Sequence, residues 1–177
     1  MLFNPYTNYF YYLTTAFLPV MLLMFILSGT VYAIGSEFKY HRAGECLKTA
    51  HGSIVRALSA KMAPYLFIYS ILMLFVNVLL IKYFGTPFKG NVWILIYNAF
   101  LFVLAYISMG IVIVSIFTSL RMALSISSVY AALAFTMSGL TFTHIAMYKP
   151  VMILGFLFPF THYHEVFINQ ALQGAPI

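Results

Sequence analysis

The sequence between Leu13 and Gly35 carries no charged side chain, and this is the feature that most restricts the fold. The run exceeds the roughly 20 apolar residues that an α-helix needs to cross the hydrocarbon core of a bilayer. Inside a bilayer the backbone polar groups must find their partners within the protein, so such a run folds as a helix. Pro19 lies within the run and predicts a local kink.

Three more apolar segments follow, and basic or turn-forming residues mark their boundaries. Composition agrees with membrane insertion, because 63% of the 177 residues are hydrophobic and only 7% are charged. Soluble domains carry about a quarter charged residues. We therefore predict an all-α membrane protein that forms a single transmembrane domain over residues 1–177. Its four predicted transmembrane helices lie at about 13–35, 62–82, 92–118 and 122–142.

The segment after the fourth predicted span is too short to form a fifth. Val151–Phe158 is apolar, but Pro159 interrupts it, and polar residues follow at once. A segment of this length does not cross the hydrocarbon core. We therefore predict a re-entrant or interfacial helical hairpin over 144–168, on the external side of the membrane, in which Pro150, Pro159 and Glu165 are the residues of interest.

One long segment, 36–61, does not resemble a membrane span, and it holds most of the charged residues of the chain. At helical spacing it separates into two faces. The apolar face holds Cys46, Leu47, Ala50, Ile54, Ala57 and Leu58, and the polar face holds Glu45, Lys48, Thr49, Gly52, Arg56 and Ser59. We predict an amphipathic helix from Gly44 to Ser59, weakened by Gly52. On pattern alone it either docks another protein or is a basic topogenic loop at the lipid headgroups.

The basic residues also predict the orientation of the chain. One side of the predicted bundle carries Arg121 and the basic residues of loop 36–61, whereas the other side carries only Lys82, Lys89 and Lys149. The positive-inside rule then places loop 36–61 in the cytoplasm and both ends of the chain outside. Because the basic residues punctuate apolar runs, the formal charge of +6 indicates membrane topology rather than nucleic-acid binding.

Several motifs resemble the permease subunit of type-2 ABC exporters. They occur in the family's order along the chain: Glu37-Phe38-Lys39, Gly44-Glu45-Cys46-Leu47, Ala60-Lys61-Met62-Ala63-Pro64-Tyr65, Gly85-Thr86-Pro87-Phe88-Lys89-Gly90, Ser138-Gly139-Leu140-Thr141-Phe142 and Leu157-Phe158-Pro159-Phe160-Thr161. Two positions depart from the family pattern, since Glu45 follows the loop glycine and Thr143 stands where a proline is usual. The resemblance implies a partial permease that lacks the family's first span, external domain and last span.

The resemblance also implies a mechanism and partners. Loop 36–61 would carry the coupling helix, which sits in a groove of the ATP-binding cassette subunit and transmits its closure to the membrane helices. By resemblance, docking falls on Glu37, Lys39, Arg42, Glu45, Leu47, Lys48 and Arg56. A second permease subunit, identical or related, would complete a dimer in the bacterial inner membrane, and the chain would serve efflux.

The chain contains no Gly-x-x-x-x-Gly-Lys-[Ser/Thr] motif. This motif cradles nucleotide phosphates in many ATPases. We therefore expect no cofactor in this chain, with ATP and Mg²⁺ on the partner subunit. Polar residues inside spans tend to face the interior of a bundle, so Asn77, Asn98 and Ser108 are candidates for the translocation path.

An alternative function is a small metal-dependent membrane enzyme that uses His144, His162, His164 and Glu165. His162 and His164 are two residues apart, which points them to different faces of a helix. No His-x-x-x-His or Glu-x-x-His pair occurs in this region. We therefore predict no metal site and no catalytic residue, and a transport subunit rather than an enzyme.

Overall fold

The computed structural model describes residues 9–40, 43–84, 90–117, 119–137, 155–156 and 158–170. All regular elements in these ranges are helical, as the sequence predicts for an all-α fold. They are α1 (Tyr9–Lys39), α2 (Ala43–Thr49), α3 (Ile54–Val78) with a wider π-helical continuation η1 (Leu79–Tyr83), α4 (Val92–Ile116), α5 (Leu120–Met137) and α7 (Pro159–Ile168).

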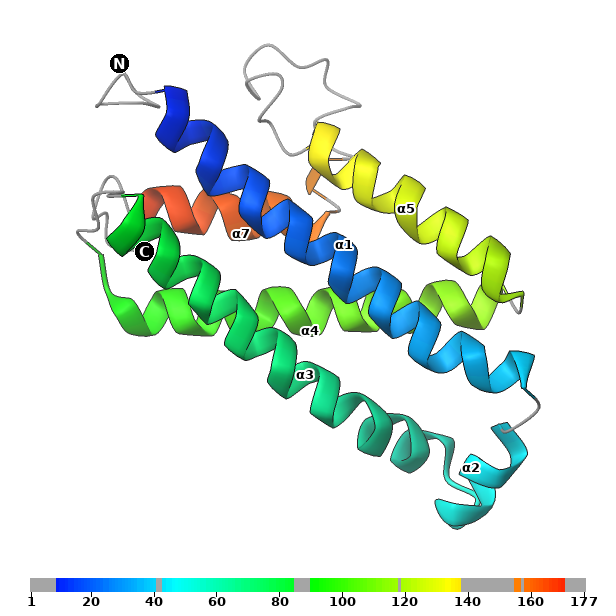
Figure 1. The fold of residues 1–177 in the computed structure, drawn as a ribbon. Helices are drawn as coiled ribbons and strands as arrows, with labels where there is room; N and C mark the ends of the chain where they lie inside the picture. The colour runs from blue at the N-terminus through cyan, green and yellow to red at the C-terminus, as the bar shows by residue number, and fades with distance from the viewer. Residues whose placement is uncertain are drawn as a thin grey trace.

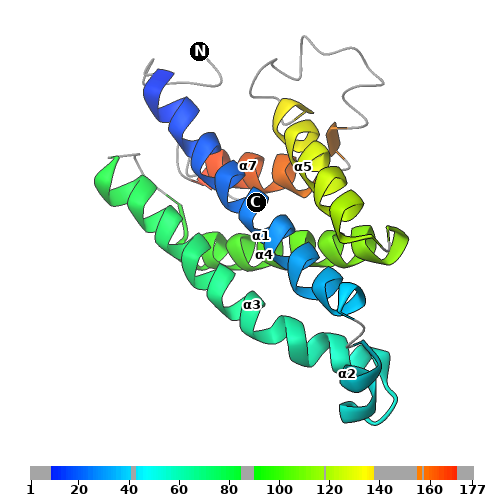
Figure 2. The ribbon, with the colours of Figure 1, turned by 45° about the vertical axis from the view of Figure 1, so that its right-hand side comes forward.

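The four long helices run alternately in opposite directions, and α1 lies between the others (Figure 1). Helix α1 packs most extensively against α4 and α5 and less extensively against α3. In the most apolar part of α1, 56% of the residues are buried inside the protein, against 17% for α3. The short helix α2 lies at one end of the bundle, whereas α7 lies in the opposite half, as Figure 2 also shows. Helix α1 is thus the central helix of the described bundle.

Within the described ranges, three helices are long and apolar enough to cross a membrane: Thr14–Lys39, Ile54–Tyr83 and Val92–Ile116. They correspond to the first three predicted spans. The second span, however, begins at Ile54 rather than near residue 62, because the Ser53 hydroxyl accepts a hydrogen bond from the Arg56 amide and caps the helix there. Pro64 therefore lies inside α3 rather than in its first turn.

The fourth predicted span is described only in part. Helix α5 is apolar over Leu120–Thr136, which is shorter than the three candidate spans. The predicted continuation to Phe142 lies outside the described residues, as do the connector 85–89 and the first part of the predicted hairpin. Helix α7 is the second part of that hairpin, and Pro159 occupies its first turn, where a missing amide hydrogen costs little.

A close approach between α1 and α4 occurs at Gly110. A Cβ atom built on Gly110 would lie 2.9 Å from both Cβ and Cγ2 of Thr30. The Thr30 Cβ atom is bonded directly to the α1 backbone, so a rotamer change does not move it away. Small residues allow membrane helices to approach in this way, and packing at such contacts is a main source of helix association in lipid. Gly110 therefore sets the distance between the central helix and α4.

We expect Gly110→Ala to destabilise the bundle by about 1–3 kcal/mol, because the added methyl group forces α1 and α4 apart. The matched control is Gly44→Ala, since a Cβ atom on Gly44 meets nothing within 4 Å. Thermal unfolding of both variants in a mild detergent measures the difference. Equal midpoints for the two variants would contradict this account of the α1–α4 contact.

Candidate functional site

The charged loop folds as a compact unit at one end of the bundle, between the last turn of α1 and the first turns of α3 (Figure 1). Glu45 and Lys48 on α2 are exposed, and so is Arg56 on α3, whereas Leu47 is half-buried. Lys39 lies over the Tyr40 ring, with its Nζ atom 5.5 Å from the ring centroid. The structure therefore brings these predicted docking residues to one end of the molecule; Arg42 lies outside the described residues.

The single helix predicted from Gly44 to Ser59 is wrong, because a turn at Ala50–Ser53 divides it. The Gly52 amide donates to the Leu47 carbonyl and the His51 amide donates to the Lys48 carbonyl, which is the Schellman pattern of a helix end. His51 has φ 54° and Gly52 has φ 77°, so both are left-handed. The predicted apolar face is broken as well, since Ile54 is 71% exposed.

His51 occupies the position in this motif where glycine is most common. A residue with a Cβ atom is disfavoured in the left-handed conformation. We expect His51→Gly to stabilise the protein by about 0.5–1 kcal/mol. Glycine has no Cβ atom, so it adopts the left-handed conformation without the steric cost that histidine bears there. Gly52→Ala is the opposite change in the same turn and is expected to destabilise. Unfolding midpoints that fall for His51→Gly would contradict the assignment of this turn.

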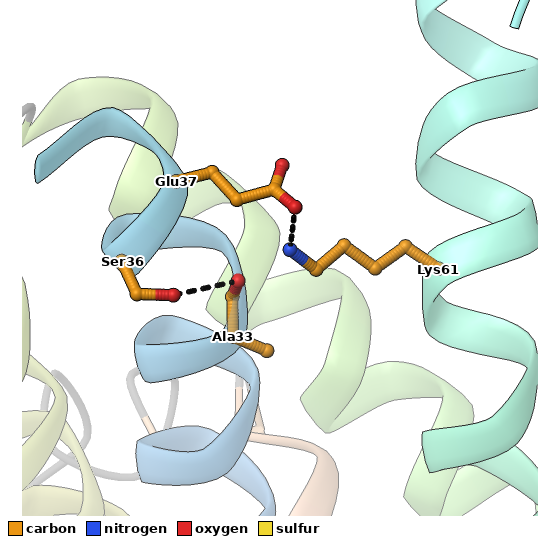
Figure 3. A network of polar contacts seen from close by, with 4 residues as sticks. All are labelled: Ala33, Ser36, Glu37 and Lys61. Atoms are coloured by element: carbon orange, nitrogen blue, oxygen red, sulfur yellow. Dashed lines mark hydrogen bonds and ion pairs between the residues drawn. The ribbon is translucent and has the colours of Figure 1, made fainter. Parts of the chain in front are cut away.

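An ion pair joins the two arms that carry α2. The Glu37 carboxylate at the end of α1 contacts the Lys61 ammonium group of α3 (Figure 3). The same part of α1 contains Ser36, whose hydroxyl donates to the Ala33 carbonyl at 3.2 Å. Both partners of the ion pair are more than two-thirds covered. Glu37, predicted as a docking residue, is therefore engaged within the chain, and it ties α1 to α3 beside α2.

Two of the three predicted path residues hold α7 against the bundle. The Tyr163 hydroxyl of α7 donates to Asn77 Oδ1 of α3 at 2.6 Å, and Asn98 Nδ2 of α4 donates to the Tyr163 carbonyl at 3.1 Å. Burial raises the pKa of the Tyr163 phenol, which keeps its proton available to Asn77. Asn98 and Tyr163 also line a cavity of about 300 Å³ between α4 and α7. Ser108, the third candidate, is exposed and donates to the Leu104 carbonyl of its own helix.

Neither Tyr163 nor Tyr106 is among the residues predicted from the sequence, although both anchor α7. The Tyr106 hydroxyl of α4 accepts a hydrogen bond from the Phe160 amide at 3.2 Å. The Phe102 ring lies 4.7 Å from that of Tyr163 and 4.8 Å from that of Tyr106, measured between centroids. A buried tyrosine needs a hydrogen-bond partner for its hydroxyl group. A tyrosine within an apolar segment therefore indicates a polar contact with another helix, and this was the signal available in the sequence.

Those of the predicted hairpin residues that the structure describes do not converge on one point. His162 is exposed and contacts the Phe156 carbonyl at 2.7 Å, whereas His164 is buried and stacks on Phe160. Glu165 is exposed, and His144 and Pro150 lie outside the described residues. Within the described ranges, no three His, Cys, Asp or Glu side chains are grouped so that they could hold a metal ion. The two described histidines thus occupy different environments on α7.

The comparisons with known proteins identify the family. A family model described as "ABC-2 family transporter protein" matches residues 1–177, the whole of the chain. No curated protein and no solved structure matches the chain. Members of this family are membrane components of ABC transporters and normally work with an ATP-binding subunit, which favours transport over the metalloenzyme alternative. The apolar helices, the charged unit at one end of the bundle and this match agree, and the chain belongs to the ABC-2 family of transporter proteins.

Proposed function

We propose that this chain is the transmembrane subunit of an ATP-driven exporter and that its α2 unit docks a separate ATP-binding subunit. The observation that carries the proposal is the position of α2. It is held between α1 and α3 at one end of the bundle, and the charged side chains of Glu45, Lys48 and Arg56 are exposed there. A partner that moves α2 therefore acts on two membrane helices directly.

The Glu37–Lys61 ion pair supports this coupling role. It joins α1 and α3 beside the unit that the partner would push. A second link lies deeper in the bundle, where the Tyr69 hydroxyl donates to the Phe25 carbonyl at 3.2 Å. Because both links are polar and specific, a displacement of α2 is passed to α1 and α3 together. In the proposed cycle, ATP binding closes the partner ATPase, the α2 unit moves with it, and the bundle opens outward for efflux.

The proposal includes an orientation and an assembly. Loop 36–61 faces the cytoplasm, both ends of this chain face outward, and the membrane is the bacterial inner membrane. The described distribution of charge supports this orientation, because Lys39, Lys48, Arg56 and Arg121 are exposed at the α2 end of the bundle. A second permease subunit completes the transporter, with ATP and Mg²⁺ bound by the ATPase pair.

Cys46 provides the experiment, since it lies on α2, is partly exposed and is the only cysteine of the chain. In inverted vesicles that lack the ATP-binding subunit, a membrane-impermeant maleimide is expected to modify Cys46. In intact cells the same reagent is expected to leave it unmodified. Adding the purified ATP-binding subunit to the vesicles is expected to slow modification at least about ten-fold, because the docked partner covers α2.

The matched control is a Cys46→Ser chain that carries Tyr83→Cys, at the end of η1, which continues α3 away from α2. Tyr83 is 83% exposed, so its replacement removes little packing beyond the contact with the Phe84 ring. This cysteine is expected to react in intact cells and to be indifferent to the ATP-binding subunit. Modification of Cys46 in intact cells would overturn the orientation, and unchanged modification in the presence of the partner would overturn the docking role.

A further inference from the structure

Thr30 and Asn77, which are buried, and Ser70, which is half-buried, each have a covered hydrogen-bonding atom that is unsatisfied. Among the described residues, no partner exists for Thr30 Oγ1, Ser70 Oγ and Asn77 Nδ2. Ser and Thr hydroxyl groups in membrane helices commonly donate to the carbonyl four residues earlier. Ser108, Ser115 and Ser125 do so here. Buried polar atoms are almost always paired, so three exceptions in one bundle call for an explanation.

Helices α1, α3 and α4 pack against one another, and by their helical positions Thr30, Ser70 and Asn77 face the junction of the three, which we call the seam. Thr30 faces α4 at Gly110, and its neighbour Gly29 is in contact with Tyr69 of α3, the residue before Ser70. Thr30 and Ser70 are therefore at the same level of the bundle. Asn77 follows Ser70 by seven residues, which is two helical turns, or about 10 Å, along the same face of α3. The seam thus presents polar atoms at two successive levels.

Each of these atoms can donate a hydrogen bond. Asn77 Oδ1 already accepts from Tyr163, so the amide group of Asn77 offers its N–H donors. The buried residues in the described ranges include no Asp, Glu, Lys or Arg. A charged group entering the seam would find no countercharge, whereas an uncharged group with oxygen acceptors would satisfy the donors.

We propose that the α1–α3–α4 seam is a hydrated binding site for uncharged groups rich in hydrogen-bond acceptors, such as hydroxyl, ether or carbonyl groups. Thr30, Ser70 and Asn77 supply its donors, and water satisfies them between transport events. Tyr163 of α7 closes the end of the seam farther from α2, through its bond to Asn77. The inference rests on the proposed transport function and names the substrate chemistry that this seam accepts.

Thiol labelling tests whether water reaches the seam. In a Cys46→Ser background, Ser70→Cys and Asn77→Cys are expected to react with iodoacetamide at least about ten-fold faster than Ala131→Cys. Ala131 is 1% exposed and lies on α5, away from the seam. Phe67→Cys controls for entry through lipid, because Phe67 is 69% exposed on the outer surface of α3. Rates for both seam cysteines equal to that of Ala131→Cys would overturn the proposal.

Met73 allows the same test on the unmodified protein. Its side chain is fully buried and lies between Ser70 and Asn77 on the same face of α3. X-ray pulses convert water to hydroxyl radicals, so water inside the seam is expected to lead to oxidation of Met73. The expected rate is no less than about a tenth of the rate at Met122, which is exposed. Oxidation of Met122 without oxidation of Met73 would show a dry seam and overturn the proposal.

Protection against labelling tests the chemical class of the ligand. Tri(ethylene glycol), which is uncharged and rich in acceptors, is expected to slow labelling of Ser70→Cys at least about three-fold, whereas choline at the same concentration has no effect. Equal protection by both molecules would overturn the assigned class. None of these measurements uses ATP or a partner, so a dry seam would leave the proposed function intact. A failed docking experiment at Cys46 would overturn that function without affecting the hydration result.

Discussion

Reversing the charges of Lys48 and Arg56 to Glu is expected to lower ATP-driven transport at least about thirty-fold. Both side chains are exposed on the α2 unit, so the change leaves the fold of the chain intact. In the complex proposed above they would face the ATP-binding subunit, where disrupting a buried charge pair costs about 2–5 kcal/mol. The affinity of the purified ATP-binding subunit for membranes that contain each variant measures the loss, and substrate efflux from vesicles measures its consequence.

Lys82→Glu is the matched control, because Lys82 is also an exposed lysine on the α3–η1 helix but lies at its opposite end. This variant is expected to bind the ATP-binding subunit normally. The variants Glu37→Lys and Lys61→Glu distinguish two roles of these residues: joining α1 to α3 through the ion pair, and contacting the ATP-binding subunit directly. Each single change breaks the ion pair and is expected to reduce coupling, and the double change restores the pair and most of the coupling. Full affinity in the Lys48 and Arg56 variant would remove α2 from the docking surface.

Hydropathy predicted the membrane helices well, because a long apolar segment in a bilayer must satisfy its backbone hydrogen bonds within the protein and therefore folds as a helix. The run that begins near Leu13 is helical, and so are the second and third predicted spans. The boundaries were less accurate, because local hydrogen bonds rather than hydrophobicity set them. Ser53 starts α3 eight residues before Lys61, near which the second span was expected to begin.

The charged loop shows a different limit of sequence reasoning. Periodicity assigned Gly44 to Ser59 to one helix, and Gly52 was interpreted only as a weak point in it. The turn depends on the left-handed conformation of His51 as well as Gly52, and a histidine gives little warning of that conformation. A periodic pattern remains readable across such a turn although the helix has ended, so the pattern alone overestimated the length of α2.

The anchoring of α7 depends on contacts between residues far apart in the sequence. Asn77 and Asn98 were recognised as polar residues within spans, which is a local property. Their common partner, Tyr163, is 86 and 65 residues away. Without knowledge of which helices lie side by side, the two asparagines could only be predicted to line the translocation path. The fold shows that both position α7, and that Asn77 Nδ2 has no hydrogen-bond partner among the described residues.

Truncating Tyr163 to Ala is expected to produce the largest loss of stability, about 3–5 kcal/mol, because its ring is buried between α3, α4 and α7. Tyr163→Phe isolates the hydroxyl group. It leaves Asn77 Oδ1 buried without a donor and is expected to cost about 1–3 kcal/mol. Tyr97→Phe is the matched control, since Tyr97 is 65% exposed on α4 and is expected to tolerate the change. Unfolding in a mild detergent, followed by helical circular dichroism, measures all three variants.

A double-mutant cycle then separates the hydrogen bond from the packing around it. Asn77→Leu also removes the bond, so the cost of combining it with Tyr163→Phe is expected to be lower than the sum of the single costs by about 0.5–1.5 kcal/mol. Additive costs would mean that the 2.6 Å contact contributes nothing beyond packing. In that case the contacts of the Phe160 and Tyr163 rings with Phe102 of α4 would hold α7 in place, and the end of the seam farther from α2 would open without any polar bond to break.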